Sequence, residues 1–118
     1  MNILVVDDDK AAGEGLSCLL SKEGYSVDLA ENGEIAFEKL THRCYNLVVT
    51  DLMMPMMDGL RLLSRIKSTG NDCPVIVITA YANIENLISV YELGGVDVLE
   101  KPFEVQQLLD IIKRVMFL

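Results

Sequence analysis

The chain lacks the cysteine patterns that staple small secreted domains or hold structural zinc. Cys18, Cys44 and Cys73 are odd in number and widely spaced, and no two of them form a CxxC pair. Neither a disulfide framework nor a zinc site is therefore suggested. We expect the three thiols to be small, mostly buried hydrophobic side chains in a reducing compartment.

Long apolar runs and an excess of basic residues are also missing. The apolar stretches are strand-sized, far below the roughly 20 residues of a membrane span. No basic segment followed by an apolar one opens the chain, so we expect a cytoplasmic address and no membrane partner. Eighteen acidic residues against ten basic ones give a formal charge of −8. Because nucleic-acid affinity comes largely from Lys and Arg, we expect no direct nucleic-acid binding by this domain.

The composition that is present is globular and indicates one α/β domain. The chain has 118 residues, of which 51% are hydrophobic and 24% charged, and we expect residues 1–118 to form a single domain. Runs rich in Val, Ile and Leu alternate with segments of helical period, which is the pattern of repeated βα units. Strands are expected at 2–6, 25–29, 46–50, 74–78 and 96–99.

Several of these runs are apolar throughout, as expected for strands that helices cover on both faces. Right-handed crossovers would then give a doubly wound, five-stranded parallel sheet of the flavodoxin-like (βα)5 type, with strand order 2-1-3-4-5. The fold class predicted from the sequence is therefore α/β.

The last two predicted helices carry more apolar residues than one core-facing stripe needs. The stripe of the first is predicted at Ile84, Leu87, Ile88 and Tyr91, and that of the second at Val105, Leu108, Leu109, Ile112 and Met116. Apolar side chains outside these stripes lie in or next to the same two helices, at Val90, Leu93, Ile111 and Phe117. These extra residues are either ordinary packing or a patch that marks a partner site.

Acidic side chains stand where two of the predicted strands end. Asp7 and Asp8 follow the first strand, and Asp51 follows the third. In a sheet of order 2-1-3-4-5 these strands are neighbours where the winding reverses, so the carboxylates would face one another. Like charges at short range repel unless a cation lies between them. Oxygen ligands that leave room for water suit Mg²⁺, or Mn²⁺, better than zinc.

A hydroxyl and an amine stand at the ends of the other two strands at that edge. Thr79 can donate a hydrogen bond to a phosphoryl oxygen. The Lys101 ammonium can pair with a carboxylate at rest and with a phosphoryl oxygen after transfer. Together with the carboxylates, these groups supply a nucleophile, a metal cradle and two charge stabilisers for phosphoryl transfer.

Four segments, VVDDD, VVTDLMMPMMDG, VITA and EKPF, resemble in order and spacing the signature motifs of response-regulator receiver domains of two-component signalling. The resemblance implies that Asp51 accepts a phosphoryl group from a histidine kinase or a phosphotransfer protein, with Mg²⁺ bound. It also implies that Asp8, Asp51 and the backbone carbonyl of Met53 are direct metal ligands, while Asp7 acts mostly through water. EKPF further resembles the receivers of enhancer-binding transcription regulators.

The resemblance also implies how the switch works. Thr79 and Lys101 match the hydroxyl and the lysine that sense the phosphoryl group. The output face, which also serves homodimers, is expected on helix 84–91, strand 96–99 and helix 105–116. Slow loss of its own phosphoryl group is the only reaction implied, so the chain is not expected to be an enzyme towards other substrates.

One position departs from the family pattern. An aromatic residue usually lies three positions before the lysine, and here that position is Val98. A valine is stiff about χ1 and has no ring to turn inward. Tyr81 and Tyr91 are the candidate substitutes for the aromatic readout.

Three rival functions fit the motifs less well. A metal-dependent phosphatase with an aspartyl-phosphate intermediate would want a second acid two residues after the nucleophile, where this chain has Met53. A flavin-binding module would need phosphate-binding donors after the first strand, but Asp7 and its acidic neighbours would repel the anion. A degenerate receiver used only for protein contacts would not need the intact acid, hydroxyl and lysine set.

Other polar and sulfur-bearing residues are expected to be structural. Asp9 is expected to be solvated loop, and Asp58 with Gly59 to start a helix by capping it. His42 is expected at the surface, near the end of the second helix. A methionine-rich loop is expected to pack rather than to bind copper, and its members are Met53, Met54, Met56 and Met57.

Overall fold

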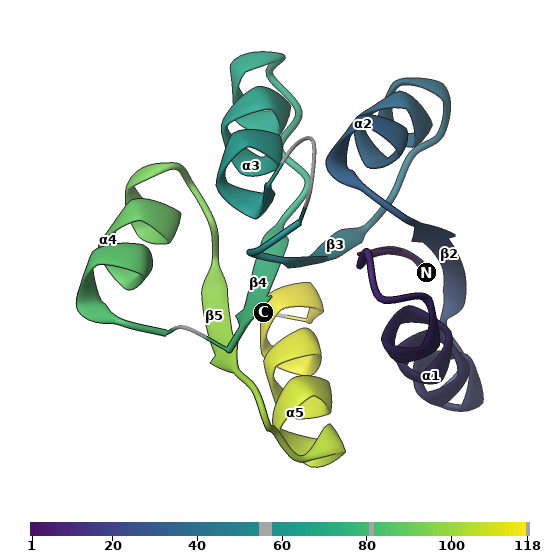
Figure 1. The fold of residues 1–118 in the computed structure, drawn as a ribbon. Helices are drawn as coiled ribbons and strands as arrows, with labels where there is room; N and C mark the ends of the chain where they lie inside the picture. The colour runs from purple at the N-terminus through teal and green to yellow at the C-terminus, as the bar shows by residue number, and fades with distance from the viewer. Residues whose placement is uncertain (55–57, 81, 118) are drawn as a thin grey trace.

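One parallel sheet with helices on both faces makes up the structure (Figure 1). The computed structural model describes residues 1–54, 58–80 and 82–117. Its strands are β1 (Asn2–Val6), β2 (Ser26–Ala30), β3 (Leu47–Asp51), β4 (Val75–Thr79) and β5 (Asp97–Glu100). Its helices are α1 (Lys10–Lys22), α2 (Gly33–His42), α3 (Gly59–Ser68), α4 (Ile84–Glu92) and α5 (Val105–Met116). The strand order is β2-β1-β3-β4-β5, which confirms the predicted doubly wound fold.

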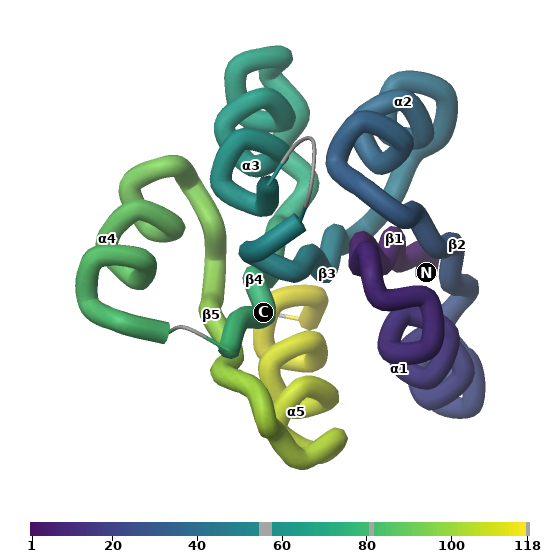
Figure 2. Tube along the Cα trace, viewed as in Figure 1, coloured from purple at the N-terminus to yellow at the C-terminus, as the bar shows by residue number. Residues whose placement is uncertain are grey.

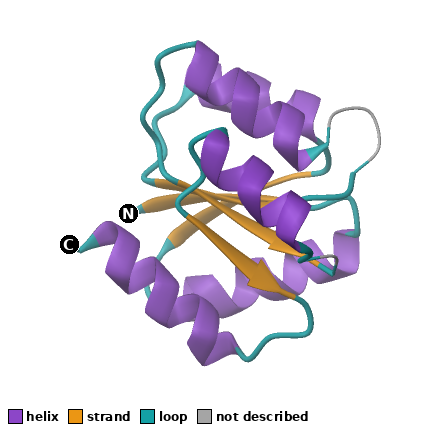
Figure 3. Ribbon diagram, turned by 90° about the vertical axis from the view of Figure 1, so that its left-hand side faces the viewer, coloured by secondary structure: helices purple, strands orange, loops and turns teal. Residues whose placement is uncertain are grey.

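The helices divide between the two faces of the sheet. Helices α1 and α5 cover one face, and α2, α3 and α4 cover the other (Figures 1 and 3). Alternate residues of each strand therefore enter different cores: Val5 and Val49 pack with α1 and α5, whereas Val6 and Val48 pack on the opposite side. Burial on both faces explains why these strands read as uninterrupted apolar runs.

The register between β1 and β3 brings two strand ends to the same level. Strand β1 lies between β2 and β3, as the trace shows (Figure 2), and Val6 pairs with Thr50 across the β1–β3 ladder. The residues that follow this pair are Asp7 and Asp51. The sheet itself therefore sets these two carboxylates side by side, at the point where the winding reverses.

The predicted strands agree with the structure to within one residue. Strand β1 is as predicted, and the other four each begin and end one residue later than expected. Asp51 and Thr79 are consequently the last residues of β3 and β4, not the first residues of the loops. Both pair in the ladder, Asp51 with Ile78 and Thr79 with Glu100, so their backbones belong to the sheet.

Acidic side chains cap the two helices that border the strand ends. The Asp9 carboxylate accepts a hydrogen bond from the Ala12 amide (3.2 Å) at the start of α1. Asp58 accepts one from the Arg61 amide (2.9 Å) at the start of α3, which confirms the predicted cap. Asp9 is exposed as expected, yet it has this structural role as well.

The core-facing stripe predicted for α4 is wrong. Ile84, Ile88 and Tyr91 are 74%, 51% and 51% exposed, whereas Val90 is fully buried. Gly95 lies close to Val90, because a Cβ added at Gly95 would be only 2.5 Å from a Val90 methyl group. The helix thus turns its smaller valine to the core and leaves larger apolar side chains outside.

The stripe predicted for α5 is correct at its centre. Leu108, Leu109 and Ile112 are buried, and Met116 packs at the edge of the same core. Val105, the first residue of the helix, is exposed, contrary to the prediction.

The expectation of mostly buried cysteines is also wrong. Cys18 and Cys44 are exposed, and only Cys73 is buried. The Cys73 thiol lies 3.3 Å from the Tyr45 carbonyl oxygen, and burial raises the pKa of this thiol to about 11. His42 is exposed at the end of α2, as predicted. Within the described ranges, no helix is both long and apolar enough to cross a bilayer.

Helix α3 begins in direct contact with the end of β3. A Cβ added at Gly59 would lie 2.4 Å from the Asp51 carbonyl oxygen and 2.9 Å from the Leu52 Cα. The Gly59 amide also donates a hydrogen bond to the Leu52 carbonyl oxygen (2.8 Å). Backbone therefore meets backbone here, and any side chain would push α3 away from the strand that carries Asp51.

Two glycine-to-alanine substitutions should have opposite effects on stability. Gly59→Ala should lower the free energy of unfolding by about 1–3 kcal/mol, because the new methyl group overlaps main-chain atoms that cannot turn aside. Gly15→Ala should raise it by about 0.5–1 kcal/mol, because that position is inside α1 and a Cβ there meets nothing within 4 Å. Urea denaturation followed by circular dichroism measures both. Equal midpoints for the two variants would contradict the close approach.

Candidate functional site

Three carboxylates meet at the carboxyl edge of the sheet. Asp7 and Asp8 come from the loop after β1, and Asp51 from the end of β3. One oxygen of each lies within 4.8 Å of an oxygen of the other two. Asp7 is buried, Asp51 is half-buried and Asp8 is exposed, so the cluster reaches from the sheet to the surface.

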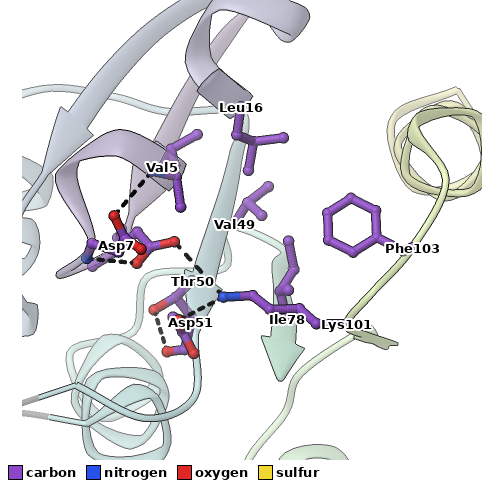
Figure 4. A pocket seen from close by; sticks show the side chains of 12 residues that line it. Val5, Asp7, Leu16, Val49, Thr50, Asp51, Ile78, Lys101 and Phe103 are labelled. Atoms are coloured by element: carbon purple, nitrogen blue, oxygen red, sulfur yellow. Dashed lines mark hydrogen bonds and ion pairs between the residues drawn. The ribbon is translucent and has the colours of Figure 1, made fainter. Parts of the chain in front are cut away.

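Lys101 brings the opposite charge to this cluster from the end of β5. Its Nζ lies 3.0 Å from Asp51 Oδ2 and 4.0 Å from Asp7 Oδ2 (Figure 4). Its backbone amide donates to the Thr79 carbonyl oxygen (2.8 Å), which ties the loop after β5 to the end of β4. The ammonium thus lies near the ends of β1 and β3, each of which is at least 50 residues from Lys101 in sequence.

Each oxygen of the Asp51 carboxylate has a donor. Oδ2 accepts from the Lys101 ammonium, and Oδ1 accepts from the backbone amide of Met53 (3.2 Å). The Thr50 hydroxyl donates to the Asp51 carbonyl oxygen (3.0 Å). The carboxylate is therefore oriented by contacts before any ligand arrives. The Met53 main chain lies against it, while the Met53 side chain is 60% exposed.

Burial and neighbouring charge shift the pKa values of two groups at the site. Burial raises the pKa of Asp7, and the nearby Asp51 and Asp8 add to that rise, although the Asp9 amide and Lys101 oppose it. Partial burial would lower the pKa of Lys101. Its hydrogen bond to Asp51 and the charges of Asp51 and Asp7 outweigh this, and the pKa is raised. Lys101 is therefore held as an ammonium ion.

The donor set of the cluster fits a hard divalent cation. The ligand atoms found to converge there, among the described residues, are carboxylate oxygens, each of which has lone pairs to spare. Three carboxylates against one ammonium leave an excess of negative charge. Mg²⁺ and Mn²⁺ prefer such oxygen ligands and keep several waters, which the exposed side of the cluster can accommodate.

Thr79, the hydroxyl expected at this edge, lies at the end of β4 beside β3. It is buried and pairs with Glu100 of β5. Thr79 thus stands on the strand between those that carry Asp51 and Lys101. The structure places all five predicted side chains at one edge, and their roles remain predictions.

Other residues that the sequence singled out lie in different places. Val98 is partly buried against the core on the α2–α4 side. Tyr91 is exposed, and its hydroxyl donates to Asp97 (3.3 Å), whereas Tyr81 lies outside the described residues. In the methionine-rich loop, Met54 packs on the core as expected, but Met53 does not. Met56 and Met57 lie outside the described residues.

Two contributions to the site escaped the sequence analysis. Thr50 is a fully buried hydroxyl that braces the Asp51 backbone, and a threonine inside an apolar run was the signal for it. The other is a largely apolar cavity beside Lys101, between α1 and the loop that joins β5 to α5, with Leu16 and Phe103 in its wall. No local sequence pattern predicts this cavity, because its lining residues come from five separate segments of the chain.

Comparison with known proteins gives a consistent result. The family model described as "Response regulator receiver domain" matches residues 3–113. Response regulator MprA of Mycobacterium sp. (strain KMS) is 41% identical over 109 residues, which are 92% of this chain and 47% of that protein. Transcriptional regulatory protein DltR of Streptococcus agalactiae (strain NEM316) is 38% identical over 113 residues, 96% of this chain and 50% of that protein.

A solved structure is similar over nearly the whole chain. It is the Francisella response regulator 1452 receiver domain, with a TM-score of 0.93 and 30% sequence identity. The match covers 98% of this chain and 95% of that one. By contrast, the chain spans about half the length of the two curated relatives.

Removing the most buried carboxylate should stabilise the fold when no divalent cation is present. Asp7→Asn in EDTA at neutral pH should melt a few degrees higher, the shift that about 1 kcal/mol gives in a domain of this size. The substitution relieves repulsion from Asp8 and Asp51, while the amide oxygen can still accept from the Asp9 amide. Calorimetry or thermal circular dichroism measures the change.

The matched control for this substitution is Asp72→Asn. Asp72 is exposed and lies in the loop between α3 and β4, so this variant makes the same change to the net charge without touching the cluster. Its melting temperature should stay close to that of the native chain. A stabilisation of Asp7→Asn no greater than that of the control would show that the carboxylates do not repel one another.

Proposed function

Because this chain belongs to the response regulator receiver domain family, we propose that it is a phospho-acceptor switch whose acceptor is Asp51. Receiver domains of two-component signalling are regulatory switches and are generally not enzymes, and response regulators receive phosphoryl groups from histidine kinases. The observation that carries the proposal is the preorganised Asp51 carboxylate, with Lys101 3.0 Å from one oxygen. We also propose that residues 1–118 form one receiver domain.

The proposed reaction is a phosphoryl transfer to a carboxylate oxygen of Asp51. A new P–O bond forms as the P–N bond to a histidine of the donor breaks, and the imidazole nitrogen keeps the bonding electron pair. The donor is a histidine kinase or a phosphotransfer protein. Positioning and electrostatic stabilisation carry most of the catalysis in such transfers. The orientation of Asp51 by Met53 and Lys101 supports this role.

Receiver domains bind Mg²⁺ at an acidic pocket, and the carboxylate cluster of this chain fits that use. We propose Asp8, Asp51 and the Met53 backbone carbonyl as direct ligands, with Asp7 acting mostly through water. When bound, the ion would neutralise negative charge on the phosphoryl group. Mn²⁺ has the same ligand preference and could replace it.

We propose that Lys101 and Thr79 read the product. Once Asp51 carries a phosphoryl group, the ammonium has a stronger anionic partner than the carboxylate it contacts at rest. The Thr79 hydroxyl would donate to another phosphoryl oxygen. A charge change of this kind biases a two-state element, here the loops after β4 and β5. Slow hydrolysis of the acyl phosphate would reset the switch.

The rival functions gain no support from the structure. A phosphatase would want a carboxylate at position 53, but that position presents an exposed methionine side chain. A flavin phosphate would meet the cluster of Asp7, Asp8 and Asp51, whose charge repels anions.

The acceptor role can be tested by intact-mass analysis after incubation with acetyl phosphate. The native chain should gain one phosphoryl group in the presence of Mg²⁺, and the adduct should be labile to base. Asp51→Asn should gain none, because the amide cannot act as the nucleophile. Without Mg²⁺ the yield should fall at least 10-fold, since the charge of the cluster then opposes the incoming anion.

A suitable control for acceptor specificity is Asp58→Asn. Asp58 is the nearest described carboxylate along the chain after Asp51, and asparagine also caps helices well. This variant should be phosphorylated as the native chain is. An adduct that persists in Asp51→Asn but disappears in another variant would move the acceptor elsewhere.

We propose that the output surface, and a homodimer, use α4, β5 and α5. The exposed Ile84, Ile88 and Tyr91 form an apolar face on α4. Polar contacts join the three elements, because the Tyr91 hydroxyl donates to Asp97 of β5 and Asp97 pairs with Arg114 of α5. An exposed apolar patch next to such a polar border is typical of a protein contact.

Ile88→Glu should abolish association of the phosphorylated chain without reducing phosphorylation. A buried, unpaired carboxylate at the contact would be costly, so the expected loss of dimer affinity is at least 10-fold. The control is Ile35→Glu, the same substitution at an exposed isoleucine of α2. Light scattering with and without acetyl phosphate measures the mass. A native chain that is monomeric in both states, or a dimer that Ile88→Glu leaves intact, would rule out a homodimer through α4.

A further inference from the structure

A cavity of about 350 Å³ opens beside Asp51 and Lys101, between α1 and the loop that joins β5 to α5. Leu16 of α1 and Phe103 of the loop after β5 come from opposite sides of it, with Val49 and Ile78 of the sheet between them (Figure 4). Its volume is at the lower end of the range for small-molecule sites. The space is therefore large enough for the body of a small ligand and too small for a folded element.

A small side chain on α1 leaves room for the cavity. Ala12 is the residue of α1 that lines the cavity one turn before Leu16. Its single methyl group leaves the room that a longer side chain would fill. The neighbouring Ala11 does not line the cavity, although both alanines are exposed. The small side chain at position 12 of α1 thus keeps the cavity open.

The cavity has an apolar wall and a charged rim. The charged part of its lining, called the rim, consists of Asp7, Asp9, Asp51 and Lys101, and Lys101 is the one cation among the lining residues, all of which are described. Three negative charges against one positive charge leave a deficit of positive charge there. A cation with an apolar body complements both parts, whereas an anion would be repelled by the carboxylates and a neutral molecule would leave the excess negative charge uncompensated.

We propose that this cavity is a binding site for small amphipathic ammonium ions. The ammonium head lies at the rim, within reach of the Asp7, Asp9 and Asp51 carboxylates, and the hydrocarbon body lies between Leu16 and Phe103. Binding removes apolar surface from water and adds charge-assisted hydrogen bonds at the head. The site itself does not depend on phosphoryl transfer.

A regulatory consequence follows if Asp51 is also the phospho-acceptor, and this part rests on the proposed function. The ammonium head would share carboxylates with Mg²⁺, so the two cations would compete. By linkage, the ligand would then lower the affinity for Mg²⁺ by the same factor by which Mg²⁺ lowers the affinity for the ligand. Amines of this class would hold the switch in its unphosphorylated state.

The chain-length dependence of binding is the first test. Ethyl-, butyl- and hexylammonium chloride are titrated by calorimetry into the native chain in EDTA, with no phosphodonor. Each added methylene should tighten binding about 3- to 4-fold, as expected for burial in an apolar cavity. Hexanoate should not bind, and 1-hexanol should bind at least 10-fold more weakly than hexylammonium. Equal binding of the three ammonium ions, or of hexanoate, would overturn the proposal.

Replacing either of two alanines of α1 by leucine locates the site. Ala12→Leu should weaken hexylammonium binding at least 10-fold and leave ethylammonium nearly unchanged, because it fills the space for the body and not the rim. Ala11→Leu makes the same change one residue away and should leave both affinities unchanged. Thermal melting checks that both variants fold. Equal hexylammonium affinities in the two folded variants would place the ligand elsewhere.

Contacts in the native chain provide a test that needs no variant. In nuclear Overhauser spectra, the hexylammonium methyl protons should contact the Phe103 ring and the methyl groups of Leu16. Contacts with Ile88 or Tyr91 of α4 instead would overturn the assignment. Failure here would leave the Asp51 phosphoryl adduct untouched, since that is measured by mass without any amine. Failure of the adduct would leave the binding data equally untouched.

Discussion

Repulsion among three carboxylates is the constraint on which the site depends. The β1–β3 register places Asp7 beside Asp51, and Asp8 extends the cluster to the surface. The paired strands hold Asp7 and Asp51 at the same level despite their like charge, and the Lys101 ammonium offsets part of the repulsion. Binding of a cation, or phosphorylation, therefore changes the repulsion among these carboxylates. Such a change in charge also changes the free energy of the loops around the site.

The sheet and the polar end of the site were predictable, because both follow from local patterns. A parallel strand that is covered on both faces reads as an apolar run, and Asp51 and Lys101 punctuate such runs. The exposed face of α4 was not predictable. In this nine-residue helix apolar residues lie on every side, and the close approach of Gly95 selects Val90 for the core. That choice depends on a tertiary contact which periodicity does not contain.

The cavity beside α1 could not be predicted for a related reason. Its lining is made of residues whose individual roles are ordinary: Leu16 and Phe103 pack against the core, and the alanine at position 12 favours the helix. What matters is the volume that these side chains leave between them. Sequence patterns report which side chains turn inward, but the space left over depends on how helices and sheet fit together.

The long sequence separation between Lys101 and Asp51 gives folding an electrostatic order. Strand β5 lies at an edge of the sheet and pairs only with β4, so a partly folded chain can join β1 to β3 before β5 docks. Such a chain carries the three carboxylates with no ammonium beside them. Docking of the last strand on β4 then delivers the counter-charge to Asp51, 50 residues away in sequence, in one step, which makes the edge strand contribute to cooperativity beyond its few backbone hydrogen bonds.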